Sequence, residues 1–205
     1  MPDGTQITPT RSAYLELKDE RLLIQEGYEF LDEKRMIVAQ EMLRQLTAYR
    51  ESLAAYQTVH DRAVVALAGA AARHGLEELT VFPRFELDGW GCEHRYYRFL
   101  GVELIDPRCP DIGWGPVPPP AVPSPEAIEC RDRFAELLPL SAELAARSAN
   151  MRRLIAEYVR TERRARALEN VLLPEIDDNI RFMEEQLEAV DQEEALRVRF
   201  ARPSN

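Results

Sequence analysis

Cysteine and histidine side chains are the first groups in this sequence that could do chemistry. Cys92 and His94 lie close together, and Cys109 and Cys130 follow further along the chain. Thiolates and imidazoles bind zinc, but structural zinc sites usually contain cysteine pairs about two to four residues apart. No Cys-x-x-Cys pair is present and the separations are irregular. The cysteines are therefore interpreted as reduced thiols, with a zinc-binding regulatory protein kept as an alternative.

Catalytic motifs are absent from the sequence. It contains no glycine-rich phosphate loop, no His-Glu-x-x-His metal site and no Ser/His/Asp set that its 3 histidines could complete. The carboxylates of Glu184, Glu185 and Glu188 form a cluster of the kind that usually marks a solvated helix face. The sequence therefore predicts no catalytic residues, no cofactor and no metal ligands, and an enzyme that acts alone is not expected.

Charge and hydropathy narrow the functional class further. The chain has 205 residues, with 26 Lys plus Arg against 36 Asp plus Glu, which gives a formal net charge of −10. An acidic chain lacks the basic face that displaces counterions from nucleic acid, so no nucleic-acid partner is predicted. No apolar run approaches the roughly 18 residues that a membrane span needs. The first residues lack the features of a secretory signal, so we expect a cytoplasmic protein without direct membrane insertion.

The elements that would position a site are mostly helical. No proline interrupts residues 10–74, where charged and apolar residues alternate throughout. Thr8 is predicted to cap this helix, with Pro9 at its first position, and Gly75 is predicted to end it in a left-handed turn. At about 1.5 Å per residue the helix would be about 100 Å long, so it must protrude and needs a partner helix.

A second long helix supplies that partner. Ser124 and Pro125 predict its start, Pro139 breaks or bends it, and a helical pattern runs over 141–202. Two arms of matched length joined through a middle segment are expected to fold back as an antiparallel pair. Apolar residues at steps of four and three predict a coiled-coil seam. The seam residues are Met42, Leu46, Tyr49, Leu53, Tyr56, His60, Ala63 and Leu67 in the first arm, and Leu154, Tyr158, Thr161, Ala165, Leu168, Leu172, Ile176, Ile180, Met183, Leu187 and Val190 in the second.

The second seam contains an irregular stretch. Three consecutive steps of four separate Leu168 from Ile180, which is a stutter that locally unwinds a left-handed supercoil. Pro174 lies inside this stretch, where it removes one backbone hydrogen bond and favours a bend in the helix. The bend is either a packing accommodation or a functional feature.

The middle segment has a different composition. Thr80–Leu87 and Arg95–Leu104 predict the two strands of a β-hairpin, with a turn at Asp88–Gly91, and Val117–Pro120 predicts an extended linker. The predicted fold is therefore mainly α, a long antiparallel two-helix coiled coil with a small central β-hairpin. The predicted segments are the first long helix over 1–75, the compact β-hairpin and proline-rich segment over 76–124, and the second helix, bent near residue 139, over 125–205.

A band of arginines on the second arm contains a recognisable motif. Residues 160–174 read Arg-Thr-Glu-Arg-Arg-Ala-Arg-Ala-Leu-Glu-Asn-Val-Leu-Leu-Pro. This stretch resembles the late motif of the D subunit of vacuolar/archaeal-type (V/A-type) rotary ATPases, approximately Lys-Thr-x-Arg-Arg-Val-Asn-Ala-Leu-Glu followed by an apolar pair and proline. Ala165 and Arg166 depart from that motif. Residues near the start, from Thr10 to Arg35, and Leu100–Val102 also resemble the family.

The resemblance implies a function that composition alone does not. Members of the family form the non-catalytic central rotor shaft of a proton- or sodium-translocating ATPase or ATP synthase, peripheral to the membrane. The shaft binds a small F subunit inside a ring of A and B subunits, and its lower end contacts a C (or d) subunit that couples to the membrane ring. A stiff, asymmetric helix pair can bias each ring site toward a different nucleotide state, which is allosteric coupling.

Basic residues on both arms are predicted to contact the ring, because arginine is favoured at such contacts. They are Lys34, Arg35, Arg163, Arg164 and Arg166. The bend near Pro174 is expected to add asymmetry to the shaft, and the hairpin over 80–104 is expected to modulate activity or to dock below the ring. The alternative is a coiled-coil scaffold or a secretion-apparatus stalk, which would self-associate or bind cargo.

Overall fold

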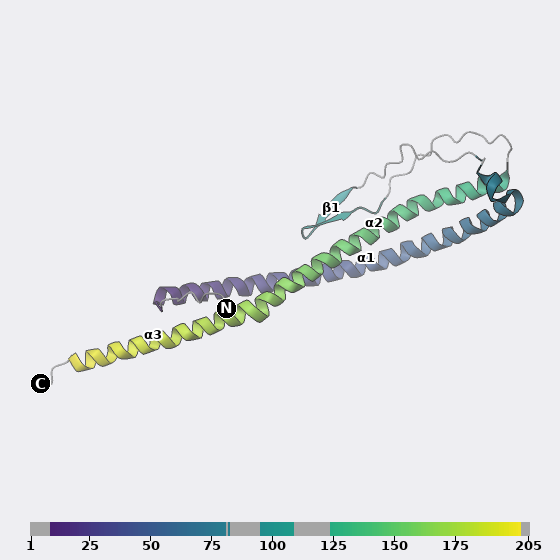
Figure 1. The fold of residues 1–205 in the computed structure, drawn as a ribbon. Helices are drawn as coiled ribbons and strands as arrows, with labels where there is room; N and C mark the ends of the chain where they lie inside the picture. The colour runs from purple at the N-terminus through teal and green to yellow at the C-terminus, as the bar shows by residue number, and fades with distance from the viewer. Residues whose placement is uncertain (1–8, 81, 83–94, 109–123, 202–205) are drawn as a thin grey trace. The chain divides into compact units, whose positions relative to one another are not determined.

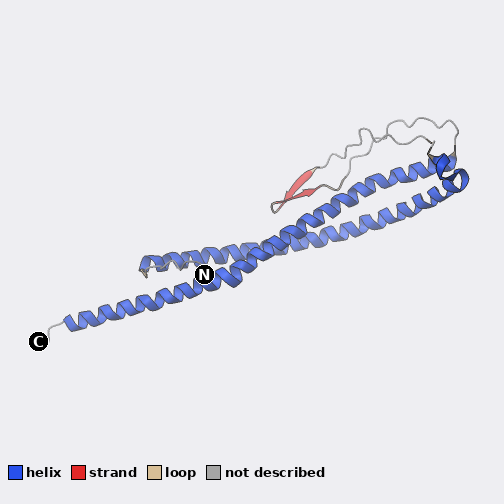
Figure 2. Cartoon of the chain, viewed as in Figure 1, coloured by secondary structure: helices blue, strands red, loops and turns tan. Residues whose placement is uncertain are grey.

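The computed structural model describes residues 9–80, 82, 95–108 and 124–201. The secondary-structure elements, in chain order, are α1 (Arg11–Leu79), β1 (Tyr96–Phe99), β2 (Val102–Ile105), α2 (Pro125–Ala167), the π-helix η1 (Leu168–Leu172) and α3 (Leu173–Ala201) (Figure 1). Helices dominate the part of the chain that is described, and the two strands form one small antiparallel sheet (Figure 2). The prediction of a mainly α fold with a small hairpin is therefore confirmed.

The chain divides into two compact units. One unit combines Met1–Ile37 with Tyr158–Asn205, and the other is the continuous segment Val38–Glu157. We call them the terminal unit and the inner unit. The terminal unit contains the first part of α1, the end of α2, η1 and α3, and the inner unit contains the rest of α1, the hairpin and most of α2.

Ion pairs show that the helices of the terminal unit are antiparallel. The guanidinium of Arg11 lies 2.9 Å from Asp191, and that of Arg21 lies 2.5 Å from Asp177. As residue numbers rise along α1, the residue numbers of the ion-pair partners on α3 fall, which is the order expected of two antiparallel helices. Between these ion pairs lies a small apolar core that removes side chains of both helices from water. It consists of Leu17, Ile176, Ile180 and Met183, with Ala13, Tyr14 and Ile24 packed against it.

The helices of the inner unit are antiparallel as well. The Ser52 hydroxyl donates a hydrogen bond of 2.8 Å to Glu143, and the Arg73 guanidinium donates one of 2.5 Å to Glu126. The second-arm part of the predicted seam is largely confirmed across both units, because Leu154, Thr161 and Ala165 are buried. The predicted seam residues Leu67, Leu172 and Val190 are exposed, so that part of the prediction is wrong.

The helix ends follow from capping chemistry. Thr10, and not the predicted Thr8, caps α1, because its hydroxyl accepts a hydrogen bond of 3.2 Å from the backbone N–H of Ala13. Pro9 therefore precedes the helix. Gly75 has a φ of 74° and a ψ of 160°, so the helical path is interrupted there as predicted. Its ψ is not that of the predicted left-handed turn, and α1 continues beyond this kink to Leu79. Ser124 caps α2 as predicted, with its hydroxyl 3.2 Å from the Ala127 N–H.

The predicted stutter contains a π-helix. Eight residues of α-helix turn through about 800°, which is about 80° beyond two full turns, so Ile176 would rotate away from the face of Leu168. In η1 the backbone N–H of Leu173 bonds to the carbonyl of Leu168, five residues back, so one turn takes up an extra residue. Ile176 and Ile180 consequently return to the core, while Leu172 inside the wide turn is exposed.

The hairpin lies later in the sequence than predicted. The single strand predicted over Arg95–Leu104 is instead both strands of the hairpin, and β2 extends one residue beyond it to Ile105. Tyr96 pairs with Ile105, and Phe99 pairs with Val102. The turn is at Leu100 and Gly101, with φ of 47° and 86°. Two positive φ values are typical of the two-residue turn that fits the twist of paired strands. The predicted turn at 88–91 and the linker at 117–120 lie outside the described residues.

Candidate contact site around Glu162

Glu162 is the centre of the predicted contact region, and it joins two of the five predicted basic residues. Its carboxylate accepts hydrogen bonds of 2.6 Å from Arg35 on α1 and 2.7 Å from Arg166 on α2. Arg166 stands one helical turn after Glu162, which is the spacing at which helical side chains meet. Arg35 also donates to Asp32, three residues before it. The structure therefore assembles a charged cluster from both helices of the terminal unit.

Electrostatics favour the charged forms of Glu162 and Arg35. The hydrogen bond from Arg35 lowers the pKa of the Glu162 carboxyl, and the bond from Arg166 lowers it further, against the opposing effect of burial. The same bond to Glu162 raises the pKa of Arg35. Only 18% of the Glu162 side chain is exposed, against 70% for Arg166. Glu162 therefore holds two guanidinium groups in fixed directions, one half-buried and one open to solvent.

Arg163 and Arg164, two of the other predicted contact residues, do not join this cluster. Arg163 and Arg164 are exposed, and Lys34 is half-buried. Arg163 and Arg164 make no hydrogen bond or ion pair with the residues that the structure describes. The predicted set thus separates into residues engaged within the chain and arginines whose donors face outward. A guanidinium in solvent keeps its five donors for a planar carboxylate of another molecule.

Pro174 is the second residue of α3, which begins directly after the π-helix. In an α-helix the proline ring clashes with the carbonyl four residues earlier and lacks the N–H that would bond to it. The wide turn of η1 lies where that clash would fall, which explains why the two features occur together. Across from η1, Gly27 lies close to Leu168, since a Cβ on Gly27 would be 3.8 Å from a Leu168 methyl carbon. The predicted bend at Pro174 stays a prediction.

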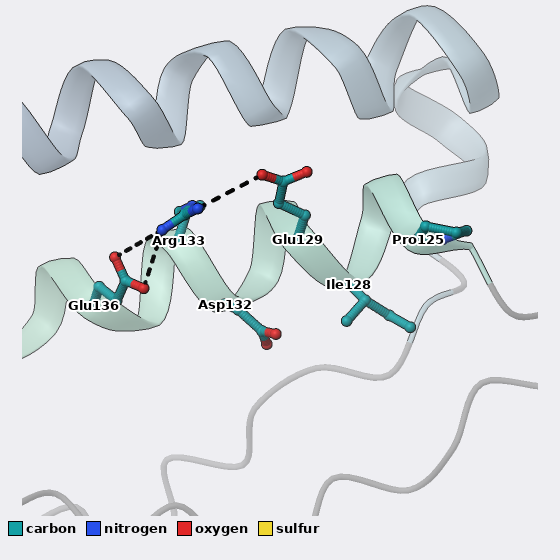
Figure 3. Close-up of a pocket in the computed structure, with 6 residues that line it drawn as sticks. All are labelled: Pro125, Ile128, Glu129, Asp132, Arg133 and Glu136. Carbon is teal, nitrogen blue, oxygen red and sulfur yellow. Dashed lines mark hydrogen bonds and ion pairs between the residues drawn. The ribbon is translucent and has the colours of Figure 1, made fainter.

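A hollow of about 670 Å³ lies beside the first turns of α2 in the inner unit. Figure 3 shows its lining, in which Arg133 stands between Glu129 and Glu136. The Arg133 guanidinium is 3.8 Å from Glu129 and 3.4 Å from Glu136. These carboxylates are thus neutralised by an arginine of their own helix. The arrangement is that of an ordinary ion-paired helix surface.

Metal chemistry finds no support in the described part of the chain. Within it, no three His, Cys, Asp or Glu side chains gather as a metal site would require. Cys130 is half-buried, and burial raises the pKa of its thiol, so the unreactive neutral form is favoured. Cys92, His94 and Cys109, the other residues of the zinc alternative, lie outside the described residues. No described helix has the length and apolar character of a membrane span.

Comparison with known proteins decides the family. The family model for the D subunit of ATP synthase matches residues 13–202, which is nearly the whole chain and includes both arms and the cluster at Glu162. This chain belongs to the ATP synthase D-subunit family. The resemblance read from the motif at 160–174 is therefore confirmed.

Individual relatives of the family agree along most of their lengths. The D subunit of the A-type ATP synthase of Pyrococcus furiosus is 27% identical over 210 residues, covering 97% of this chain and 94% of the relative. The D subunit of the V-type ATP synthase of Deinococcus radiodurans is 28% identical over 195 residues, covering 92% and 84%. That of Thermotoga neapolitana is 23% identical over 195 residues, covering 94% and 95%. Archaeal and bacterial members of the D-subunit family thus match nearly all of the same chain.

Two polar residues of this D-subunit family chain were missed from sequence. Glu162 was not singled out within the motif at 160–174, although its four-residue spacing to Arg166 was a visible signal. Asn150 was not singled out, although it stands four residues before the first predicted seam residue, Leu154. A polar residue at a seam position is a known device for fixing register. Asn150 is fully buried, which is the burial that such a position predicts.

Proposed function

We propose that this chain is the non-catalytic central-stalk rotor subunit of a V/A-type ATPase or ATP synthase that translocates protons or sodium ions. The match to the ATP synthase D-subunit family over residues 13–202 is the observation that supports this most. In this function the chain couples ATP hydrolysis or synthesis in a ring of A and B subunits to rotation of the membrane ring. It binds an F subunit, contacts a C (or d) subunit at the membrane end, and lies on the cytoplasmic side, peripheral to the membrane.

The charged cluster supports a physical route for that coupling. Arg163 and Arg164 carry outward guanidinium donors, and Glu162 fixes the direction of Arg166. Lys34 and Arg35 complete the proposed ring-contact set on α1. Each ring site then meets a different side of the helices, and a contact made with one site and not another shifts that site's equilibrium. A coupling free energy of about 1–3 kcal/mol changes an affinity by about 5- to 150-fold.

Each of three segments of the chain has its own role in the proposed function. Residues 1–75 and 125–205 are the two arms of the coiled coil, with Pro139 and Pro174 as candidate bends. Residues 76–124 form the part that modulates activity or docks toward the membrane ring. The wide turn before Pro174 supports a departure from helical symmetry at that height, which a rotor needs because a symmetric shaft would present the same face to all ring sites.

The first experiment is a pull-down of the tagged chain from its native cells, followed by mass spectrometry and an ATPase assay of the eluate. Recovery of A-, B- and F-type subunits with ATPase activity is expected. Recovery of the chain alone, as oligomers or with other cargo, from a lysate whose ATPase is intact, would instead support the coiled-coil scaffold.

The contact residues are tested in the assembled complex. Combined alanine substitution of Lys34, Arg35, Arg163, Arg164 and Arg166 should lower ATP turnover coupled to ion transport. The matched control replaces Arg50 and Arg62, two exposed arginines of α1 in the inner unit, and should leave turnover unchanged. Equal coupled turnover in the five-residue variant and the wild type would refute the contact assignment without touching the family membership.

A further inference from the structure

Asn150 makes a paired contact with the backbone of the hairpin. Its side-chain oxygen accepts a hydrogen bond of 2.7 Å from the N–H of Ile105, and its side-chain NH₂ donates one of 2.7 Å to the carbonyl of the same residue. Asn150 has no exposed surface, so both bonds are shielded from water. Both lie within the inner unit, and they join α2 to the end of β2.

The Asn150 amide pairs with Ile105 in the way that a residue of a neighbouring strand would. β2 pairs with β1, and Ile105 is the last residue of β2. An amide side chain offers one donor and one acceptor side by side, which is what one residue of an adjacent strand would offer. A two-stranded hairpin is marginally stable in water by itself. The hairpin therefore depends on what it packs against, and Asn150 is the polar part of that support.

The adjoining turn of α2 supplies the rest of the support. Leu154 on α2 and Leu104 on β2 are both fully buried. Arg153 donates a hydrogen bond of 2.9 Å to the carbonyl of Glu103, and its guanidinium lies 6.0 Å from the ring centre of Tyr96. Asn150 and Arg153 of α2 thus hydrogen-bond to the backbone of β2, and Arg153 also lies near the ring of Tyr96 on β1.

A second polar cluster faces the hairpin from α1. Glu41 is buried and accepts hydrogen bonds of 2.6 and 2.7 Å from Arg44 and one of 2.7 Å from Gln45. Burial raises the pKa of Tyr97 on β1, and the charge of the Glu41 carboxylate raises it further. The Gln45 amide oxygen is buried and has no hydrogen-bond partner among the described residues. The polar cluster on α1 therefore contains a buried acceptor without a hydrogen bond from the described residues, whereas the Asn150 amide on α2 is hydrogen-bonded through both its oxygen and its nitrogen.

We propose that Asn150 is the positioning residue that fixes the hairpin on α2, and that the fixed hairpin is the form in which the inner unit modulates ATP turnover. The second half of this statement rests on the proposed function. Asn150 binds backbone groups of Ile105, so its contribution to the position of the hairpin does not depend on which side chains β1 and β2 carry.

Hydrogen–deuterium exchange of the full-length chain tests the first half. Asn150→Leu keeps the branched shape of the side chain but leaves the Ile105 N–H and carbonyl unpaired, so exchange in peptides covering 96–106 should become roughly 10- to 100-fold faster. Peptides from α1 and α3 should keep their protection. Asn150→Gln retains an amide and should recover part of the protection. The matched control is Asn179→Leu, which replaces a half-buried asparagine of α3 in the terminal unit and should not affect the hairpin.

The outcomes separate the two halves. Unchanged hairpin exchange in Asn150→Leu would overturn the proposal, as would equal loss of protection in Asn150→Leu and Asn150→Gln. Where the Leu variant fails to fold by circular dichroism, Asn150→Ser replaces it in the same comparison. ATPase turnover of the reconstituted complex tests the second half, and a released hairpin with unchanged turnover would overturn that half alone. The pull-down judges the proposed function independently, because it uses the wild-type chain.

Discussion

The guanidinium of Arg35 lies 2.6 Å from the carboxylate of Glu162, although 127 positions separate the two residues in the chain. This bond ties α1 to α2 inside the terminal unit at the height of the arginine band. The same Glu162 carboxylate also accepts a hydrogen bond from Arg166, so it fixes the direction of that guanidinium. A residue that was overlooked in the sequence thus organises the residues that were predicted.

Replacing Glu162 by Gln should destabilise the folded state in a pH-dependent way. The hydrogen bonds from Arg35 and Arg166 lower the Glu162 pKa in the folded state, so its contribution is fully present above the unfolded carboxyl value of about 4.3. That contribution is lost as the pH falls through the lower folded-state pKa. Urea unfolding of both proteins should therefore show a difference near neutral pH that disappears in acid. Glu185→Gln, at an exposed position, serves as the control, and a difference that persists unchanged in acid would contradict this explanation.

Replacing Ser124 by Ala should lower the free energy of unfolding by about 1 kcal/mol, because it removes the N-cap of α2. The same hydroxyl lies 2.6 Å from Nε2 of His74, so the link between the end of α1 and the start of α2 is lost as well. Thermal and urea unfolding measure the effect. Ser124→Asp should restore most of the stability because aspartate also caps helices, and a Ser124→Asp variant as unstable as the alanine variant would contradict the capping argument.

Two glycines of α1 should respond in opposite directions to alanine. Gly75 has a φ of 74°, which strains any residue with a Cβ, so Gly75→Ala should cost about 1–3 kcal/mol of stability. Gly69 has no atom within 4 Å of where its Cβ would lie, so Gly69→Ala should stabilise the helix by about 0.5–1 kcal/mol. Chemical unfolding of the two variants and the wild type measures both changes in the free energy of unfolding. Two shifts of the same sign would show that the conformation at Gly75 is not what limits that position.

The wide turn of η1 should allow the loss of one residue. Deleting Val171 together with Pro174→Ala should convert η1 into α-helix while Ile176, Ile180 and Met183 still face the core. The free energy of unfolding of this double variant should stay within about 1 kcal/mol of that of the Pro174→Ala variant alone. Deleting Arg181 instead should rotate Met183, which is 1% exposed, by about 100° away from the core and cost about 2–5 kcal/mol. Equal losses in the two deletions would contradict the interpretation of η1 as an inserted residue.

Features with local causes could be predicted from the sequence. Ser124 caps α2 and Gly75 interrupts α1 because capping hydroxyls and positive φ depend on single residues and their immediate neighbours. The repeat of apolar residues likewise predicted the buried positions at Leu154, Thr161 and Ala165. At the start of α1 the sequence offered two threonines within three residues, and the structure uses Thr10, whose hydroxyl reaches the N–H of Ala13.

Features with non-local or unusual causes could not be predicted. The hairpin turn escaped detection because Leu100 has a φ of 47°, a conformation that asparagine or glycine normally signals and leucine does not. Asn150 and Glu162 escaped because their partners, Ile105 and Arg35, are far away in the sequence and no repeat marks such pairs. The five predicted contact residues were chosen by charge, which cannot tell Arg163, open to solvent, from Arg35, already bound within the chain.

The division into a continuous inner unit and a terminal unit built from both chain ends has a consequence during synthesis. Val38–Glu157 is one uninterrupted stretch, so it can fold while later residues are still being added by the ribosome. Leu17 cannot pack against Met183, its partner in the terminal core, until the chain has been translated as far as Met183. For that interval the first turns of α1 carry apolar side chains without their cover. The apolar side chains of this part of α1 therefore stay open to solvent or to a chaperone for longer than those of the inner unit.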